Sequence, residues 1–579
     1  IKPSGFGQAI IMLVYVPLLT FTGVEGKMFQ PMAVTVILAL FSAFVLSLTF
    51  VPALIAIGIT GTVEEQENRF MRALRRLYEP ALKRAMSTPG AMVVAAMVLF
   101  ATAMLMFSRL GQEFIPTLDE KNIAMNALRI PSSSLSQSQA MQLQIETTIA
   151  AFPQVATVFS KTGTAEVASD PMPVNASDTF IILKPREDWP DPKLSKAELQ
   201  EQIGAAVAVL PGNNMEFSQP IQMRFNELLA GVRGDIAVKV FGDEFEPMVK
   251  AANQIAGIMR TTPGAVDVKV EQTSGLPFLD ISVDKMEAAR LGLTVTTIQD
   301  VIGTAIGGRE AGFVFEGDRR YSIVVRLSDD VRRNFDALEN LPVPLPGAMA
   351  NGRTPNILLK QVARFEQREG PNQISREDGK RRVVVTANVR GRDVASVVED
   401  VQSKVRADVR LPPGYWIKWG GQFENLAAAR QRLIVVVPAC FLAILFLLYA
   451  ALGSVRDALL VFSAIPLALT GGVASLWLAG MPFSVSAAVG FIALSGIAVL
   501  NGLVMLSYIK QLRLEGVSLR EATRVGALTR LRPVAMTALV AALGFVPMAL
   551  ATGTGAEVQK PLATVVIGGL VSATLLTLL

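Results

Sequence analysis

The sequence predicts a bundle of membrane-spanning α-helices joined to a soluble α+β domain built of repeated β-α-β(-β) subdomains. Three observations lead to this fold class. The chain of 579 residues is 51% hydrophobic, which is a high share for a soluble protein. Long apolar runs gather toward both ends of the chain, whereas the middle is polar and alternating. The polar middle also contains one succession of strands and helix twice, which indicates duplicated subdomains.

Eight apolar runs approach or exceed the roughly 20 residues that a helix needs to cross a bilayer. They are 8–24, 32–57, 91–109, 433–452, 458–480, 484–508, 533–551 and 561–579. We therefore expect spans within 1–60, 91–110 and 433–579. Because the chain begins at Ile1 and ends inside the last apolar run, we interpret it as a fragment of a longer protein.

Lysine and arginine concentrate in two of the short loops between spans. The segment 61–90 contains "RFMRALRRLYEPALKRAM", which predicts an amphipathic helix on the membrane surface. The other basic loop joins the sixth and seventh apolar runs. Short basic loops remain in the cytoplasm, so counting spans places 111–432 on the opposite side, the periplasm of a Gram-negative cell. Basic residues placed beside spans also argue against nucleic-acid binding.

The two repeated units lie within 111–290. The first reads as strand, helix, strand and strand in "KNIAMNALRI", "SLSQSQAMQLQIETTIAAF", "QVATVFSKTG" and "DTFIILKP". The second repeats this order in "DIAVKVFG", "EPMVKAANQIAGIMRTT", "GAVDVKVEQ" and "PFLDISVD". A proline, Pro153 or Pro263, follows each helix, as helix-stop rules expect. We interpret 291–375 as an inserted, strand-rich module with few helical signals, and 376–432 as the completion of the repeated architecture.

Composition excludes several classes of function. The chain has a single cysteine, Cys440, and no histidine, so thiolate clusters and the commonest metal ligand and proton shuttle are absent. A metal site must then use carboxylates, amides, carbonyls or methionine sulfur. We find no nucleotide-binding motif and no nucleophile-base constellation. The sequence therefore predicts neither an enzyme nor a resident cofactor, and it argues against ATP as the energy source.

Several stretches carry a resemblance to a known family. They include "GQEFIPTLDE", "NALRIPSSSLSQ", "FSKTGTAEVASDPMP", "MRFNELLAGVRGDIAVKVFGD" and "GFIALSGIAVLNGLVML". The chain resembles, from end to end, the resistance-nodulation-division (RND) transporters, and within them the heavy-metal efflux branch of the cobalt-zinc-cadmium (CzcA-like) type. The resemblance begins around the family's fifth span and stops within the twelfth, so the chain lacks the first four spans and the first periplasmic loop.

This resemblance implies an inner-membrane pump that exports divalent heavy-metal cations such as zinc, cobalt or cadmium in exchange for protons. The family works as a homotrimer and joins a periplasmic adaptor and an outer-membrane channel. By the same resemblance, 111–432 is the second half of the porter domain, and 291–375 is its docking module. The metal ion is the transported substrate, and membrane lipid surrounds the spans.

The resemblance also points to residues beside the metal site. Asn126 and Glu227 align with positions where copper- and silver-exporting members of the family carry methionines beside the metal site, and Met125 stands next to Asn126. We expect Glu227 in a turn between the repeat units, where its carboxylate would face a cleft. Oxygen donors favour a hard ion such as zinc, cobalt or cadmium. A one-residue slip in the alignment would place Met125 at the site and favour copper or silver. The alternative for Glu227 is a salt bridge to Arg224 or Arg233.

Glu271 and Thr273, in "EQTSGLP", are further candidates for lining the same cleft. Their alternative is a solvated hairpin at the tip of the second repeat. Asp178 and Asp280 lie on equivalent strands of the two units, and we interpret both as exposed strand positions.

Proton coupling requires a titratable group inside the bilayer, and none of the eight runs has one at its centre. Asn501 and Thr537 are instead candidates for an accessory part of the relay. The family's titrating carboxylates lie on the fourth span, which is absent here, and Asn501 would hydrogen-bond to such a group. The alternative for Asn501 is a helix-packing contact beside Gly502.

Three other functions compete with metal export. Export of amphiphilic molecules needs a wide pocket rich in Phe and Trp, whereas aromatic residues make up 7% of this chain. A membrane scaffold or secretion accessory fits the duplicated subdomains less well. An extracytoplasmic hydrolase is disfavoured because the chain has no histidine.

Overall fold

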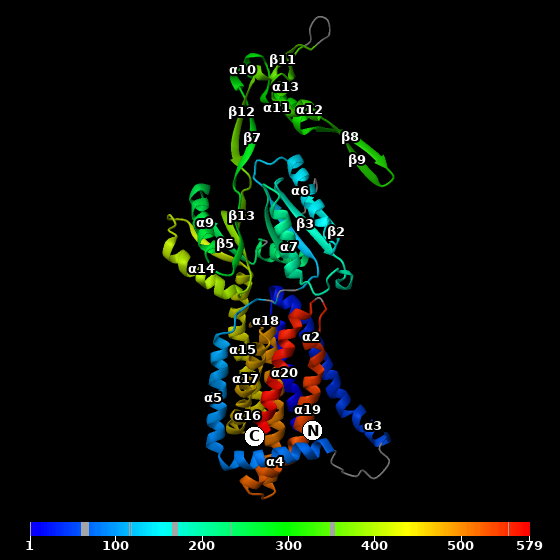
Figure 1. The fold of residues 1–579 in the computed structure, drawn as a ribbon, viewed down its shortest axis with the longest axis vertical. Helices are drawn as coiled ribbons and strands as arrows, with labels where there is room; N and C mark the ends of the chain where they lie inside the picture. The colour runs from blue at the N-terminus through cyan, green and yellow to red at the C-terminus, as the bar shows by residue number, and fades with distance from the viewer. Residues whose placement is uncertain are drawn as a thin grey trace.

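The computed structural model describes residues 2–58, 69–114, 116, 119–164, 172–232, 234–347, 354–553 and 555–578. Figure 1 shows an elongated molecule with a helical bundle at one end, a soluble domain above it, and a module projecting beyond that domain. The predicted fold class, a helical bundle joined to an α+β domain of repeated units, is confirmed.

The bundle contains the long apolar helices. Within the described part of the chain, seven helical segments are long and apolar enough to cross a bilayer. They comprise α2 (Gly23–Leu48), α5 (Pro89–Ser108), α15 (Gln422–Leu452), α16 (Val455–Phe462) with α17 (Ala464–Leu478), α18 (Val485–Leu514), α19 (Leu519–Leu550) and α20 (Ala556–Leu578). A short helix, α3 (Phe50–Gly58), continues α2 (Figure 1).

The predicted span 8–24 is shorter in the structure than expected. Its chain forms α1 (Lys2–Tyr15) and a 3-10 helix, η1 (Val16–Thr20), which begins at a proline turn. The apolar helical part falls short of the roughly 20 residues that cross a bilayer. α1 still belongs to the bundle, because Ile10 and Val14 are buried in the same core as residues of α18.

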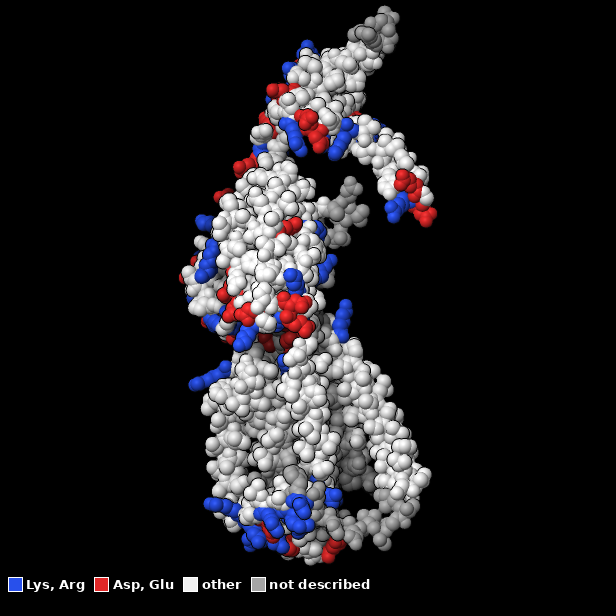
Figure 2. All heavy atoms as spheres, turned by 45° about the vertical axis from the view of Figure 1, so that its right-hand side comes forward, with Lys and Arg blue, Asp and Glu red and all other residues white. Residues whose placement is uncertain are grey.

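The predicted amphipathic helix is α4 (Arg69–Ser87), and residues 61–68 of that segment lie outside the described part. Figure 1 shows α4 lying across the end of the bundle that faces away from the soluble domain. Tyr78 and Leu82 pack into a cluster with Leu531 and Val534 of α19. Lys and Arg side chains gather at this end in Figure 2.

The first soluble unit is a four-stranded sheet covered by two helices. Its elements are β1 (Ile123–Leu128), α6 (Leu135–Ala150), β2 (Val155–Thr162), β3 (Ala176–Leu183), η2 (Arg186–Asp188), α7 (Lys196–Ala208) and β4 (Asn214–Ser218). The strand order is β2-β3-β1-β4. Ser134 and Ser195 cap the two helices, and Ile145 and Ile203 bury the helices against Met125 of β1.

The second unit repeats this arrangement. It comprises β5 (Ile236–Phe241), α9 (Phe245–Arg260), β6 (Ala265–Val270), β14 (Lys380–Val389), α14 (Val394–Asp408) and β15 (Trp416–Gly421). A short additional strand, β13 (Ser375–Glu377), also pairs with β14. β6 pairs with β14, β14 with β5, and β5 with β15. The strands and helix of 380–421 thus complete the second unit, whereas the last residues of the predicted segment 376–432 belong to the bundle helix α15.

The prediction is wrong for one strand of the second repeat. The stretch "PFLDISVD" lies in β7 (Ser274–Val283), which pairs with β12 (Ala363–Pro371) in a separate two-stranded ribbon. β14 takes the expected place between β6 and β5. Its Val383, Val384 and Val385 are all buried, and a continuous apolar run is typical of a strand covered on both faces.

The β7–β12 ribbon leads into the inserted module. The module contains α10 (Lys285–Arg290), α11 (Val295–Ile302), a π-helix η3 (Gly303–Gly307), β8 (Arg309–Glu316), β9 (Arg319–Val325), α12 (Asp329–Arg333), α13 (Phe335–Glu339), β10 (Pro342–Pro344), β11 (Asn356–Leu358) and η4 (Leu359–Gln361). It is thus more helical than the sequence predicts. Its own core includes Ile298, Val343 and Leu359, and the β8–β9 hairpin projects from it (Figure 1).

Candidate functional site

The helix α8 (Pro220–Ala230) joins the two soluble units, and Glu227 lies on it rather than in the predicted turn. Pro220 suits the first turn of a helix, and the carboxylate of Glu120 accepts hydrogen bonds from the backbone N–H groups of Ile221 and Gln222 at 2.5 and 2.7 Å. A carboxylate at this end satisfies free N–H groups and complements the helix dipole. These contacts explain why the stretch continues as a helix.

Glu227 forms an ion pair within α8. Its Oε2 lies 3.2 Å from a guanidinium nitrogen of Arg224, one helical turn earlier. This is the salt bridge that the sequence offers as the alternative to a ligand role, and the other proposed partner, Arg233, lies outside the described residues. The Glu227 side chain is 16% exposed, so it still reaches the surface.

Asn126 and Met125 face opposite sides of β1. Met125 is fully buried in the apolar core of the first unit. Asn126 points to the other face, where its Nδ2 donates to Oδ1 of Asp178 at 2.9 Å. Because successive side chains of a strand alternate between faces, a single strand cannot present both residues to one ion.

Asn126 is the centre of a polar row across the first sheet. It stands directly opposite Asp178 of β3 and Glu216 of β4 in the strand registers. All three side chains are buried, so the interpretation of Asp178 as an exposed position is wrong. We refer to Asp178, Asn126 and Glu216 as the oxygen-donor row. Directly opposed residues share one face of a sheet, so these three point the same way.

The second unit covers this row with polar groups of its own. Nζ of Lys269, on β6, lies 3.2 Å from Oε2 of Glu216, and both side chains are less than a tenth exposed. Nδ2 of Asn388, on β14, donates to Oε1 of Glu216 at 3.4 Å and to Oδ2 of Asp267 at 3.2 Å. The row therefore lies at the contact between the two units, and Lys269 compensates part of its negative charge.

Asp235, at the start of β5, anchors the same contact. Its carboxylate accepts hydrogen bonds from Nε2 of Gln222 and Gln422 and from the backbone N–H of Val389. Burial raises the pKa of Asp235, and the nearby Glu216 carboxylate raises the pKa further. These bonds connect α8, the second sheet and the first residue of α15, so they join the soluble units to the bundle.

Glu271 and Thr273 lie apart from this row, at the base of the β7–β12 ribbon. The Glu271 carboxylate accepts hydrogen bonds from the hydroxyl of Ser375 and, at 3.0 Å, from the backbone N–H of Val384. Burial raises the pKa of Glu271. Thr273 is buried and lines an open groove of 1090 Å³ beside α9. The predicted solvated hairpin is therefore wrong for both residues.

The five predicted metal ligands thus occupy four different environments. In the part of the chain that the structure describes, no group of three or more His, Cys, Asp or Glu side chains is arranged to hold a metal ion. The sequence did not single out Glu216, Lys269 or Asn388. Alternation in "NMEFS" is a signal for the short strand that carries Glu216, but the register of that strand against β1 is what places Glu216 beside Asn126.

In the bundle, Asn501 and Thr537, the two candidates for an accessory part of the relay, lie close together. Oγ1 of Thr537, on α19, is 3.4 Å from Oδ1 of Asn501, on α18. Both residues line a cavity of 390 Å³, which is otherwise mostly apolar and is bounded by residues of α1, α2, α18, α19 and α20. The Nδ2 group of Asn501 is buried without a hydrogen-bond partner among the described residues. A buried amide donor of this kind fits a partner on a further helix.

Comparisons with known proteins identify relatives along the whole chain. Residues 3–579 match the AcrB/AcrD/AcrF family. The cation efflux system protein CzcA of Alcaligenes sp. (strain CT14) is 56% identical over 579 residues, which is 100% of this chain and 54% of that protein. The cobalt-zinc-cadmium resistance protein CzcA of Cupriavidus metallidurans is also 56% identical over 579 residues, with the same coverage.

A solved structure shows the same fold. The crystal structure of a heavy metal efflux pump (crystal form II) matches with a TM-score of 0.87 and 36% identity, over 100% of this chain and 56% of that one. The chain spans about half the length of the curated relatives that it matches.

Proposed function

The chain belongs to the AcrB/AcrD/AcrF family, and from this membership we propose that the protein exports divalent heavy-metal cations, with zinc, cobalt and cadmium as the expected substrates. The names of its relatives, a cation efflux protein and a cobalt-zinc-cadmium resistance protein, support this substrate class. A pump of this kind is a transporter rather than an enzyme.

The observation that carries the proposal is the oxygen-donor row at the contact between the two soluble units. Asp178, Asn126 and Glu216 point to one face of the first sheet, and carboxylate and amide oxygens bind hard or borderline divalent cations. Lys269 now lies against Glu216. A metal ion that binds the row replaces this ammonium group, which requires the two units to move apart.

The other candidates have smaller roles in this proposal. Glu227, partly exposed on α8, is a ligand along the path by which the cation reaches the row. Glu271 and Thr273, at the base of the ribbon, line a separate groove and bind metal only after rearrangement. Met125 would have to leave the core of its unit, and this disfavours copper or silver as the substrate because those ions prefer sulfur ligands.

We further propose that proton exchange drives export, with Asn501 and Thr537 as neutral hydrogen-bonding partners of a titrating carboxylate. That carboxylate would belong to a segment that the relatives have and this chain does not cover. In this proposal the bundle lies in the inner membrane and the soluble domain in the periplasm. The protein is a homotrimer there, joined to an adaptor and an outer-membrane channel, with 291–375 as the docking module.

The decisive experiment measures zinc, cobalt and cadmium retained by cells that express the protein. Glu216→Gln removes a charged ligand from the row, and we expect retained metal to rise at least fivefold. The matched control is Glu201→Gln, an exposed residue of the same unit, which should export normally. Binding of radioactive zinc to the purified variants separates lost affinity from lost protein.

Glu227→Ala tests the second ligand, with Arg224→Ala as its control. Both substitutions break the same ion pair, in which Arg224 is 52% exposed, and ion pairs at the surface contribute only about 0–1 kcal/mol to stability. If Glu227 binds metal, only its own substitution weakens export. Equal export by these two variants assigns Glu227 to the ion pair alone. Normal export by Glu216→Gln, in the first experiment, would exclude the oxygen-donor row as the metal site.

A further inference from the structure

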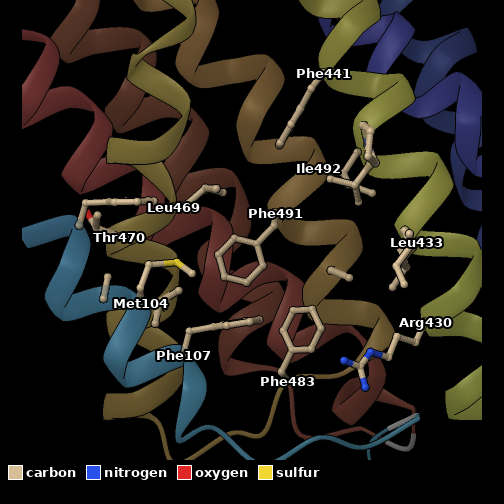
Figure 3. A pocket seen from close by; sticks show the side chains of 17 residues that line it. Met104, Phe107, Arg430, Leu433, Phe441, Leu469, Thr470, Phe483, Phe491 and Ile492 are labelled. Atoms are coloured by element: carbon tan, nitrogen blue, oxygen red, sulfur yellow. The ribbon is translucent and has the colours of Figure 1, made fainter. Parts of the chain in front are cut away.

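A cavity of 590 Å³ lies inside the helical bundle, between α5, α15, α17 and α18. Figure 3 shows the rings of Phe107, Phe483 and Phe491 around it, with Met104 beside them. Phe107 stands near the end of α5, and Phe483 just before α18. Backbone hydrogen bonds join Phe483 to Gly111 and Glu113, where the chain leaves the bundle for the soluble domain. The cavity is therefore in the half of the bundle next to that domain.

Aromatic and aliphatic side chains form almost all of the cavity wall. The rings of Phe107 and Phe483 meet edge to face with centroids 5.0 Å apart, and those of Phe483 and Phe491 are 6.2 Å apart. Thr470, a polar lining residue, already donates its hydroxyl proton to the carbonyl of Leu467. Sequence reasoning missed this aromatic pocket, because its phenylalanines come from helices far apart in the chain.

Arg430 is the single charged residue among those that line the cavity in the described part of the chain. It lies on α15 just before the apolar run that begins at residue 433, so it marks the edge of the bilayer. Figure 3 shows its guanidinium group directed toward Phe483 at the rim of the cavity. An arginine at this level reaches the headgroups of the lipid bilayer.

The cavity opens on the outer surface of the bundle. Met104 of α5 and Ile434 of α15 both line it and are 52% and 65% exposed. Other apolar residues of these two helices are exposed as well: Met97 and Leu105 on α5, and Val435 and Leu442 on α15. Such a surface faces hydrocarbon when the helices lie in a bilayer. Any molecule that enters between α5 and α15 therefore comes from the membrane.

We propose that this cavity binds an anionic phospholipid from the leaflet next to the soluble domain, with an acyl chain among the phenylalanine rings and the phosphate on Arg430. The apolar wall suits a hydrocarbon chain, and guanidinium groups bind phosphate through paired hydrogen bonds. The volume falls in the range of about 300–1,000 Å³ typical of small-ligand pockets. A spanning helix, about 10 Å across and about 30 Å long, is several times larger.

The bound lipid would brace the joint between the bundle and the soluble domain. It would fill the space behind Phe483, whose backbone holds Gly111 and Glu113. The lipid is a resident component, not a transported molecule, and the proposal does not depend on metal export.

Native mass spectrometry of the purified protein tests the proposal. The protein is stripped of lipid in a mild detergent and mixed with phosphatidylglycerol or with phosphatidylethanolamine of identical acyl chains. We expect one tightly bound phosphatidylglycerol per chain and at least a fivefold preference over phosphatidylethanolamine. Arg430→Gln should abolish this preference, whereas Arg520→Gln, an exposed arginine at the opposite end of the bundle, should retain it.

Two substitutions on α5 test the position of the acyl chain. Ala103 is buried and lines the cavity, whereas Ala101 is exposed and lies outside its lining. Ala103→Phe should lower bound phospholipid at least fivefold, and Ala101→Phe should leave it unchanged. A photoactivatable phosphatidylglycerol, with its reactive group on the acyl chain, should label Met104 or Phe107 in the unmodified protein. This measurement stands even if Ala103→Phe misfolds.

Three results would overturn the proposal. One is the absence of stoichiometric phospholipid after purification and lipid addition. Another is equal binding by the Ala103→Phe and Ala101→Phe variants when both are folded. The third is a crosslink to another protein segment, and not to lipid, from a photoreactive amino acid placed at position 107. This crosslink would show that a protein helix occupies the cavity.

Discussion

Lys269 contributes a buried ion pair to the contact between the soluble units. Its ammonium group lies against Glu216 with both side chains nearly excluded from water. Removing one partner of a buried ion pair leaves the other charge uncompensated, whereas removing both is often nearly neutral. The pair therefore fixes how the two units meet more than it adds to overall stability.

Lys269→Met should destabilise the soluble domain by about 3–5 kcal/mol, because Glu216 then remains charged and buried. The measurement is thermal unfolding of the purified protein. Lys193→Met, at an exposed position, should change stability by no more than about 0.5 kcal/mol. The double variant Lys269→Met with Glu216→Gln should recover most of the loss, and failure to recover it would show that Lys269 acts through other contacts.

Glu113 gives the soluble domain a dependence on pH near neutrality. Burial, together with the neighbouring Asp393 carboxylate, raises the pKa of Glu113 from 4.5 to about 7. Asp393 itself caps α14 and accepts a hydrogen bond from the backbone N–H of Gln112 at 3.1 Å. Glu113 and Asp393 are thus two neighbouring acidic groups at the joint between the soluble domain and the bundle.

The stabilising contribution of Glu113 is fully present below its unfolded pKa of 4.5 and is lost as pH rises through about 7. Glutamine stays neutral at every pH, so the Glu113→Gln variant does not lose this stability as pH rises through about 7. At pH 8 the variant should be more stable than the parent by on the order of 2 kcal/mol, and at pH 4 the two should be equal. Chemical unfolding at several pH values measures this difference. Glu201→Gln is the control, and a gain independent of pH would contradict the assignment.

At the scale of elements, the start of α15 is a tightly constrained point of the described chain. Gly421 has φ of +78° and ψ of −154°, a region essentially restricted to glycine. A Cβ atom there would lie 2.4 Å from the carbonyl oxygen of Asp235. The next residue, Gln422, donates its backbone N–H to that same oxygen at 2.8 Å. This turn connects the second sheet to a bundle helix.

Gly421→Ala should therefore destabilise the protein far more than Gly453→Ala at the other end of α15. Gly453 also has a positive φ, of +68°, but a Cβ atom would meet open space. We expect about 1–2 kcal/mol for Gly453→Ala and at least about 2 kcal/mol more for Gly421→Ala. Thermal unfolding compares them, and equal effects would show that the contact with Asp235 relaxes freely.

The sequence predicts most elements but not which strands pair. Alternation and the prolines after the helices locate β1, α6, β5 and α9 correctly. The position of β14 beside β5 could not be predicted, because β7 follows β6 directly and has an equally good strand pattern. The helices of the inserted module were missed for another reason. The longest of its α-helices, α11, has 8 residues, too few to show a helical period clearly.

The same limit applies to the candidate site. Asn126 was found by resemblance, and its oxygen-donor row became visible only through the registers of three strands. Glu216 and Asp178 lie far from Asn126 in the sequence, and nothing local marks them as neighbours. Local pattern determines the face of a strand that a residue occupies, whereas non-local pairing determines what lies beside it.

At the scale of the whole molecule, the β7–β12 ribbon links the described part of the inserted module to the rest of the soluble domain. Val283 and Ala363 stand opposite each other at the end of this ribbon, and the module has a core of its own. Replacing 284–362 by an Asn-Gly turn should therefore leave both units folded, since this dipeptide closes a two-stranded hairpin. Hydrogen exchange of β5 and β14 measures the outcome. Loss of protection in these strands would show that the module supports the second sheet.

The interrupted second sheet has a consequence for how the protein is made. The first sheet has all its strands within one short stretch of chain, so it can close soon after translation of β4. The second must bring Asp235 and Asn388 together across 153 residues, and closing such a loop is slow. While the ribosome synthesises the insertion, β5 and α9 have exposed apolar faces. We expect chaperones to engage the nascent chain at this stage.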